Sequence, residues 1–189
     1  MQDITKTFTI QWVGPFKNMQ QMKQYLGKES TCDTSLFNFY YFPGNKKGKG
    51  YSCSKIYAYF GIHKKIDGID KRLNNYHTHY KDFHENGNMR IWIGAFGNEK
   101  DQQEGNIEDA ETLFISTYGN KIFTENRKKI KANIRESICI INLFYKTNEE
   151  PWIRKPSDIF FMDDVLIHET EEKVKRTLVA KLKAIKWKR

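Results

Sequence analysis

The sequence predicts an α+β fold, in which a central antiparallel β-sheet is flanked by helices. Two observations lead to this prediction. Aromatic runs typical of strands stand at 39–42 and 57–61, on either side of a glycine-rich connection. Further along, apolar residues recur at helical spacing over 69–80 and 107–118. A chain of 189 residues has room for one domain with additions at its ends.

Residues 1–35 are predicted to form a strand and a short helix that pack on this domain as an addition. Residues 7–13 alternate well enough for a strand, and Gly14-Pro15 is expected to end it. Residues 18–26 suit a short helix that stops at Gly27. Nothing in this part of the chain indicates chemistry.

Residues 36–148 are expected to form the core, beginning with a hairpin. The two aromatic strands are joined by PGNKKGKG at 43–50, which is turn chemistry and predicts a long hairpin tip. A helix over about 68–80 is expected next, with Ile69 and Leu73 on its apolar stripe.

Two further strands and a second helix complete the predicted core. The nearly all-apolar stretch 89–96 predicts a third strand, central in the sheet. A helix over 107–118 ends at Gly119. Residues 137–145 predict another strand, which can pair with the strand at 7–13.

Residues 149–189 are predicted to be an appendage that ends in a basic amphipathic helix. The helix is expected from Glu169 to about Trp187, with acidic residues at its start and lysines at its end, as the helix dipole favours. This appendage can bind DNA, clamp the core or dimerise, and the sequence does not choose among these roles.

The composition narrows the class of protein. A net charge of +9 and a pI of about 9.3 indicate a polyanionic or acidic partner, although a lysine-rich composition alone gives the same charge. Three cysteines without a Cys-x-x-Cys pair argue against a disulfide framework or a zinc ribbon. There is no secretory signal pattern and no apolar run of ~18 residues, so we expect a cytoplasmic protein with no membrane segment.

Glu111 stands out within the helix predicted over 107–118. On a helical wheel it lies within about a quarter turn of the apolar face formed by Ile107, Ala110, Phe114 and Tyr118. A carboxylate there costs desolvation energy unless a partner such as a cation is present. The alternative is a glutamate at the rim that reaches solvent.

The order of several short motifs resembles the GIY-YIG nuclease family over residues 36–135. Tyr59-Phe60-Gly61 is similar to the Tyr-Ile-Gly motif. The Gly-Ile-Tyr motif corresponds to Asn38-Phe39-Tyr40 or Phe39-Tyr40-Tyr41, in either case without its glycine. Three further residues match in order. Arg72 is the arginine on the following helix, and Glu111 is the glutamate on a later helix. Asn126 is the asparagine that follows Glu111 by 126 − 111 = 15 positions.

This resemblance implies a metal-dependent DNA endonuclease, of a small restriction or mobile-element type. Glu111 would hold a divalent cation, expected to be Mg²⁺. Arg72 would brace the scissile phosphate, and Asn126 would fix geometry by hydrogen bonding. Tyr59, Tyr40 or Tyr41 would orient or deprotonate water, with a phenolate stabilised by Lys64, Lys65 and Arg72.

His77 is expected to act as a general acid, to contact phosphate, or to be a plain surface residue. The resemblance favours a role in the site, because the place of His77 behind Arg72 is close to that of a histidine in the family. His77 does not complete a metal site with His79, since residues two apart point to different faces of a helix. DNA contacts are expected from lysines and arginines beside these motifs. These are Lys46, Lys47, Lys49, Lys64, Lys65, Arg127, Lys128, Lys129 and Lys131.

Two other readings remain open from the sequence. The lost glycine of the first motif also fits a non-catalytic nucleic-acid-binding protein with a decayed site. The aromatic pairs also fit plain core packing in an unrelated basic protein. The sequence does not indicate a preferred DNA sequence, and both a monomer and a homodimer are possible.

Overall fold

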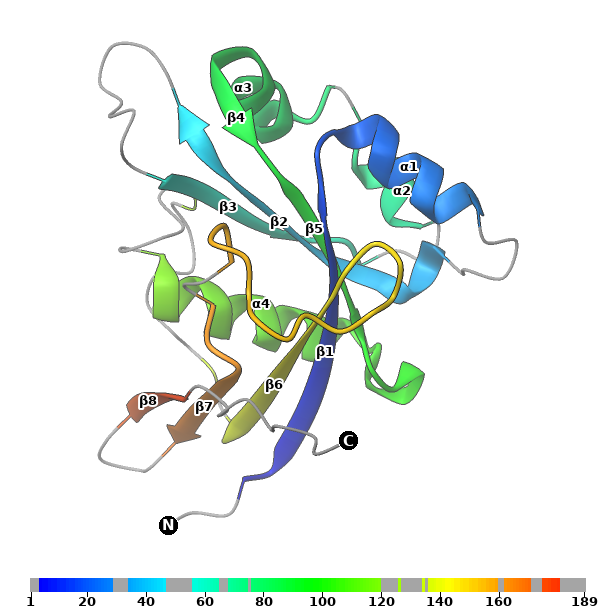
Figure 1. Ribbon diagram of the computed structural model, residues 1–189. Helices are drawn as coiled ribbons and strands as arrows, with labels where there is room; N and C mark the ends of the chain where they lie inside the picture. Colours follow the sequence, from blue (N-terminus) through cyan, green and yellow to red (C-terminus); the bar gives the residue numbers. More distant parts are fainter. Residues whose placement is uncertain are drawn as a thin grey trace.

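A computed structural model describes residues 4–28, 34–46, 56–64, 68–74, 76–119, 126, 134, 136–159, 162–170 and 175–180. Within these residues, eight strands form one sheet in the order β3-β2-β5-β1-β6-β7-β8, and β4 pairs with β2 (Figure 1). The strands are β1 (Lys6–Phe16), β2 (Phe37–Lys46), β3 (Ile56–Ile62), β4 (Gly87–Met89), β5 (Ile91–Phe96), β6 (Ile138–Tyr145), β7 (Val165–Thr170) and β8 (Lys175–Ala180). The helices are α1 (Met19–Lys28), α2 (Ile69–Arg72), α3 (Thr78–Asn86) and α4 (Glu104–Tyr118), with short 3₁₀ turns η1 (Thr34–Leu36) and η2 (Glu99–Asp101).

The predicted hairpin and third strand are confirmed. β2 and β3 pair antiparallel, with Phe42 opposite Tyr59, and β5 lies against the other edge of β2. The predicted pairing of the strand at 137–145 with the first strand is also confirmed, since β6 runs alongside β1. This last pairing is parallel, so the expected antiparallel sheet is in fact mixed.

β1 lies in the middle of the sheet, between β5 and β6 (Figure 1). It does not end at Gly14 but continues to Phe16, with a shift in its register against β5 after Val13. Gly14 has φ 156, and a β-carbon there would stand 2.8 Å from the ring of Trp92. Glycine at this position therefore lets β1 continue past the ring of Trp92, where the β-carbon of another residue would collide with that ring. The three predicted parts, 1–35, 36–148 and 149–189, all contribute strands to this sheet.

Each face of the sheet carries its own hydrophobic cluster. On one face, Trp12, Phe39 and Phe60 pack against α4 and against the segment that follows β6. On the other face, Tyr40 and Phe42 pack against residues of α1, α2 and α3. Alternate residues of β2 thus face different layers, as the pleat of a strand requires.

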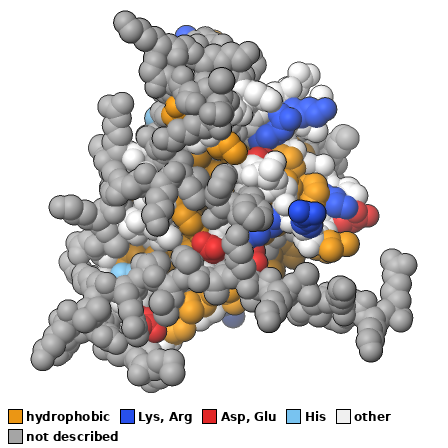
Figure 2. Space-filling model, turned by 60° about the vertical axis from the view of Figure 1, so that its left-hand side comes forward, with side chains coloured by type: hydrophobic (Ala, Val, Ile, Leu, Met, Phe, Trp, Pro, Cys, Tyr) orange, Lys and Arg blue, Asp and Glu red, His pale blue; other side chains and the backbone are white. Residues whose placement is uncertain are grey.

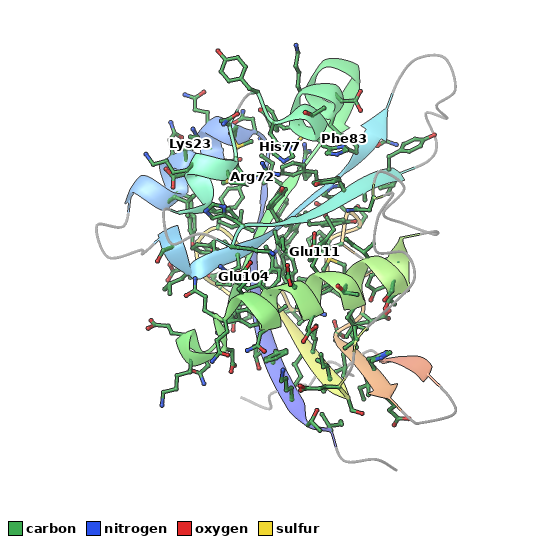
Figure 3. All side chains as sticks on the ribbon, turned by 180° about the vertical axis from the view of Figure 1, so that it is seen from behind. Lys23, Arg72, His77, Phe83, Glu104 and Glu111 are labelled. Carbon is green, nitrogen blue, oxygen red and sulfur yellow. The ribbon has the colours of Figure 1, made fainter. Side chains whose placement is uncertain are left out.

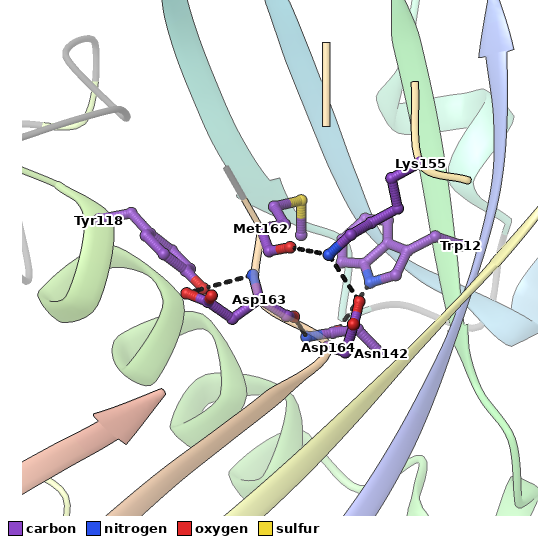
Figure 4. A network of polar contacts seen from close by, with 7 residues as sticks. All are labelled: Trp12, Tyr118, Asn142, Lys155, Met162, Asp163 and Asp164. Carbon is purple, nitrogen blue, oxygen red and sulfur yellow. Dashed lines mark hydrogen bonds and ion pairs between the residues drawn. The ribbon is translucent and has the colours of Figure 1, made fainter. Parts of the chain in front are cut away.

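The segment between β6 and β7 is held to the sheet by a polar network (Figure 4). Lys155 pairs with the carboxylate of Asp164 at 2.6 Å and donates to the Met162 carbonyl oxygen. The side chain of Asn142 donates to the Asp163 carbonyl oxygen at 2.8 Å and accepts from the Trp12 indole at 2.9 Å. Tyr118 of α4 donates to the Asp163 carboxylate at 2.9 Å. These bonds connect β1, β6 and α4 to the C-terminal strands.

One predicted helix is broken in the structure. Instead of running over 68–80, it consists of α2, which ends at Arg72, and α3, which begins at Thr78. Leu73 is extended, with φ −93 and ψ 102. The side chain of Asn74 accepts a hydrogen bond from the Tyr76 N–H at 2.9 Å, a local bond with which asparagine competes against helix formation.

The predicted C-terminal helix is wrong over its described part. Residues 165–170 and 175–180 form β7 and β8, which pair antiparallel, and β7 also pairs with β6. β-Branched residues such as Val165, Ile167 and Thr170 suit a strand. Residues 181–187 lie outside the described part of the chain. Among the described residues, the search for a helix long and apolar enough to cross a bilayer found none.

Candidate functional site

The two tyrosine motifs meet where Tyr40 on β2 lies opposite Gly61 on β3. Tyr40 is fully buried, and a β-carbon at Gly61 would overlap its ring. The glycine of the second motif therefore makes room for the tyrosine of the first. The side chain of Asn38 donates to the His63 carbonyl oxygen at 3.1 Å, which ties β2 to the end of β3.

The Tyr40 hydroxyl lies 3.1 Å from Nε2 of His77. The other ring nitrogen, Nδ1, accepts the backbone N–H of Tyr80 at 3.4 Å. Burial, followed by the positive charge of Arg72 and by His79, lowers the pKa of His77 to about 4. The imidazole is therefore neutral at neutral pH with its proton on Nε2, and it donates to the oxygen of Tyr40.

Tyr40 also hydrogen-bonds with Arg72 and with the Tyr59 hydroxyl. Because its oxygen accepts from His77 and Arg72, Tyr40 donates its own proton to Tyr59. That bond raises the pKa of Tyr40 and lowers that of Tyr59, as expected for this direction. The hydroxyl proton of Tyr59 is not used in this chain of bonds, so Tyr59 is the tyrosine able to donate outward.

Burial dominates the ionisation of both tyrosines. It raises the pKa of Tyr40 and of Tyr59 above the usual 10, and the charge of Arg72 offsets only part of this effect. Burial of the tyrosines therefore works against the phenolate that the family resemblance implies. Lys64, one of the cations expected to stabilise that phenolate, is instead paired with Glu104 at 3.0 Å and with Glu108. These two carboxylates raise the pKa of Lys64.

Glu111 lies on the other side of β3 from this cluster. α4 packs beside β3 through the stacked rings of Phe60 and Phe114, whose centroids are 4.7 Å apart. Glu111 lies one turn before Phe114, and its charge raises the pKa of Tyr59. Figure 3 shows Arg72 and His77 across the β2–β3 strands from Glu111. The structure thus brings Tyr40, Tyr59, Arg72 and His77 together on one face of the hairpin, whereas Glu111 lies on α4 across these strands.

Asn126 is held against the backbone of β3. Its side-chain oxygen accepts the Phe60 N–H at 2.9 Å, and its side-chain nitrogen donates to the Phe60 carbonyl oxygen at 2.8 Å. Phe60 is the residue between Tyr59 and Gly61 in the second motif. Asn126 therefore fixes the strand that carries the site.

Comparisons with known proteins add no relative to this picture. The chain matches no protein-family model, and neither the curated proteins nor the solved structures contain a significant match. The functional argument therefore depends on the residues and their geometry.

Tyr41 does not belong to the cluster. Since side chains alternate along β2, Tyr41 faces the opposite layer from Tyr40 and packs with Phe60 and the α4 residues. Its hydroxyl lies 3.5 Å from the Asp158 carbonyl oxygen, and burial raises its pKa. Its role is core packing, which corrects its place among the candidate tyrosines.

Most predicted DNA contacts cannot be placed. Lys47, Lys49, Lys65, Arg127, Lys128, Lys129 and Lys131 lie outside the described residues, as does the side chain of Lys46. In Figure 2 the described basic side chains gather toward one side of the drawn face, with acidic side chains beside them. Four described lysines are in ion pairs: Lys6, Lys64, Lys146 and Lys155.

Sequence reasoning missed the role of His79. Its ring is stacked on that of Tyr59, with centroids 3.8 Å apart and an interplanar angle of 16°. The broken helix explains this, because α3 begins just before His79 and turns it and His77 toward the same tyrosine pair. The sequence signal was only a pair of histidines two residues apart, which an unbroken helix would have separated.

Proposed function

We propose that the protein is a metal-dependent endonuclease that hydrolyses phosphodiester bonds in DNA, with a site of the GIY-YIG type. The observation that carries this proposal is the cluster of Tyr40, Tyr59, Arg72 and His77 around one pair of hydroxyl groups. Two tyrosines, a guanidinium and an imidazole joined by hydrogen bonds are an unusual set for packing alone. The resemblance in motif order supports the same conclusion.

Each residue has a role that follows from its surroundings. Arg72 is exposed at the end of α2, where its guanidinium can pair with two phosphate oxygens. After Tyr59 has lost its proton to solvent, its phenolate orients the attacking water and accepts a proton from it as the new P–O bond forms. The bond to the leaving oxygen breaks, and that oxygen takes a proton from solvent. Tyr40 and His77 hold Tyr59 in place. We assign His77 to positioning rather than acid catalysis, because it is neutral near pH 7.

Glu111 is the described residue suited to hold the cation. Within the described residues, no group of three or more His, Cys, Asp or Glu side chains is arranged around a common point. Mg²⁺ fits such a site, since it usually keeps several waters and binds through one or two carboxylates plus substrate phosphates. A bound cation supplies positive charge to the phosphoryl oxygens and lowers the pKa of a coordinated water.

A plasmid-nicking assay tests the proposal. We expect the wild-type protein to nick supercoiled DNA with Mg²⁺ and not with EDTA. Glu111→Gln should reduce the rate by ~10³ or more, because losing the cation removes several kcal/mol of transition-state stabilisation. DNA binding should remain, since no basic group is removed. Glu108→Gln is the matched control on α4, because Glu108 pairs with Lys64 and not with the tyrosines.

The competing candidate is a non-catalytic nucleic-acid-binding protein. The raised pKa values of both tyrosines and the missing glycine of the first motif favour it. DNA binding without nicking at any divalent cation would establish this candidate and refute the nuclease. Equal nicking by wild type and Glu111→Gln would remove Glu111 from the site.

A further inference from the structure

Tyr76 is almost wholly exposed beside the proposed site. Its side chain is 90% exposed, which makes it one of two large apolar residues at this level among the described residues, the other being Ile153 at 92%. Exposure of a single apolar side chain is common and needs no explanation by itself. Tyr76 is distinguished by its place in the turn that follows Arg72, and by the hydrogen bonds that hold the backbone of this turn.

The turn between α2 and α3 holds Tyr76 outward. Asn74 accepts the Tyr76 N–H with its side-chain oxygen at 2.9 Å and the His77 N–H with its carbonyl oxygen at 3.0 Å. His77 is buried against Tyr40, whereas Tyr76, its neighbour in the chain, points to solvent. These two bonds hold the backbone of the turn, which places His77 in the site and Tyr76 on the surface.

The surroundings of Tyr76 suit a nucleic acid strand. Lys71 and Arg72 at the end of α2 are exposed, and Arg72 is the residue proposed to hold a phosphate. An exposed aromatic ring offers its face to a flat base, and such stacking tolerates any base. Ile153 lies in the segment after β6, on the face opposite α2 and α3, and offers no aromatic surface.

We propose that Tyr76 is a nucleobase-stacking residue, which receives an unpaired base next to the phosphate bound by Arg72. This inference rests on the proposed function for its ligand, nucleic acid, but not on cleavage. It assigns the exposed ring a ligand of defined chemistry, a base rather than a peptide or another copy of the chain.

Binding measurements in EDTA test it without cleavage. Fluorescence anisotropy is measured with a short labelled oligothymidylate and with an abasic sugar-phosphate chain of equal length. Tyr76→Ala should weaken oligothymidylate binding by about 5- to 150-fold, the equivalent of ~1–3 kcal/mol per stacked base, and leave abasic-chain binding unchanged. Tyr76→Phe should bind within about twofold of wild type, because it keeps the ring. Ile153→Ala, with equal exposure, should change neither.

The outcomes separate this inference from the proposed function. If Tyr76→Ala binds both chains as wild type does, or if wild type binds neither, Tyr76 is not a stacking residue, whether or not the protein nicks DNA. If the loss on oligothymidylate is found but wild type never cuts, the stacking role stands and the nuclease proposal fails. Equal losses on both chains would show that Tyr76 supports phosphate contacts instead, which overturns the inference.

Discussion

Tyr40 and Tyr59 are adjacent tyrosines with different roles. Tyr40 accepts from His77 and Arg72 and donates to Tyr59, so its oxygen has no capacity left for a substrate. Tyr59 accepts that bond and retains its own proton. A chain of donors of this kind orients the last hydroxyl, while burial keeps both phenols protonated in the free protein. At this scale the site is assembled but not ionised.

The low pKa of His77 predicts a specific pH dependence of stability. The pKa is about 4 in the folded protein, against 6.5 when unperturbed. The unfolded chain therefore binds a proton between these values and the folded protein does not, so stability is full above about 6.5 and falls as the pH drops to about 4. The loss should be on the order of 2–3 kcal/mol. His77→Gln keeps a donor for Tyr40 and does not titrate.

Denaturant unfolding at a series of pH values measures this loss. The difference between wild type and His77→Gln should shrink or reverse between pH 6.5 and 4. Parallel curves over that interval would show that His77 titrates equally in both states, and its burial against Tyr40 would then not control its charge.

Arg72 is expected to set the pH dependence of cleavage. Its charge lowers the pKa of both Tyr40 and Tyr59, so its removal raises them. If the phenolate of Tyr59 is the base, the rate of the wild type rises by about tenfold per pH unit until that pKa is reached. Arg72→Gln should show the same rise displaced to higher pH, in addition to a lower rate. An unchanged pH profile with a lower rate would limit Arg72 to phosphate binding.

At the scale of elements, the hairpin and α4 create the site by their relative placement. The register of β2 and β3 sets Tyr40 over Gly61, and the stacking of Phe60 on Phe114 holds α4, which carries Glu111, against β3. None of these contacts is local in sequence. A change in this register by one residue would move Tyr40 to the opposite layer.

Gly61→Ala tests the close approach of the two strands. The new β-carbon would overlap the Tyr40 ring, so the ring must move and its bonds to His77 and Tyr59 must break. We expect a loss of ~1–3 kcal/mol in stability, as is typical of overpacking, together with loss of cleavage. Gly105→Ala on α4 is the control, because nothing lies within 4 Å of its β-carbon and the substitution should be neutral or stabilising.

Thermal unfolding and nicking assays on both variants decide the matter. If Gly61→Ala were as stable and active as Gly105→Ala, the Tyr40 ring would not be held over Gly61, and the proposed chain of hydrogen bonds would lose its support.

The sequence was sufficient for elements whose pattern is local, and insufficient where tertiary contacts decide. The hairpin and α4 follow from aromatic runs and apolar spacing. The break after Arg72 was missed because the apolar stripe of Ile69 and Leu73 continues across it, while Asn74 closes a turn. The strands β7 and β8 were missed because the sequence pattern there also fits a helix. The pairing of β7 with β6 selects the strand conformation. Tyr40 could not be separated from Tyr41 until the register was known.

At the scale of the whole molecule, the positive charge is distributed unevenly along the chain. The chain carries a net charge of +9, yet Lys6, Lys64, Lys146 and Lys155 are engaged with carboxylates. The pairs of Lys6, Lys64 and Lys146 are more exposed than that of Lys155 and contribute little to stability, but all four reduce the positive potential that the lysines present. The basic stretch 121–135 holds six basic residues and one acidic residue in the sequence. We therefore assign most of the attraction for phosphate to stretches such as this one rather than to Lys64.

DNA affinity should fall steeply with salt, and the slope should identify the lysines responsible. Contacts with ~6–10 phosphates would weaken binding by about 10³–10⁵ between ~50 and ~200 mM salt. Replacing Lys128 and Lys129 by Gln should reduce the slope of log affinity against log salt by about 2, since each phosphate contact contributes ~0.9. Lys64→Gln is the matched control, because Lys64 already neutralises Glu104 and Glu108. Its loss should leave the slope unchanged, or raise repulsion slightly by freeing the two carboxylates. Filter binding in EDTA over this salt range measures both slopes.

A flat response of DNA affinity to salt would argue against any phosphate-tracking surface. An effect confined to Lys64→Gln would show instead that this lysine leaves its carboxylates to bind DNA.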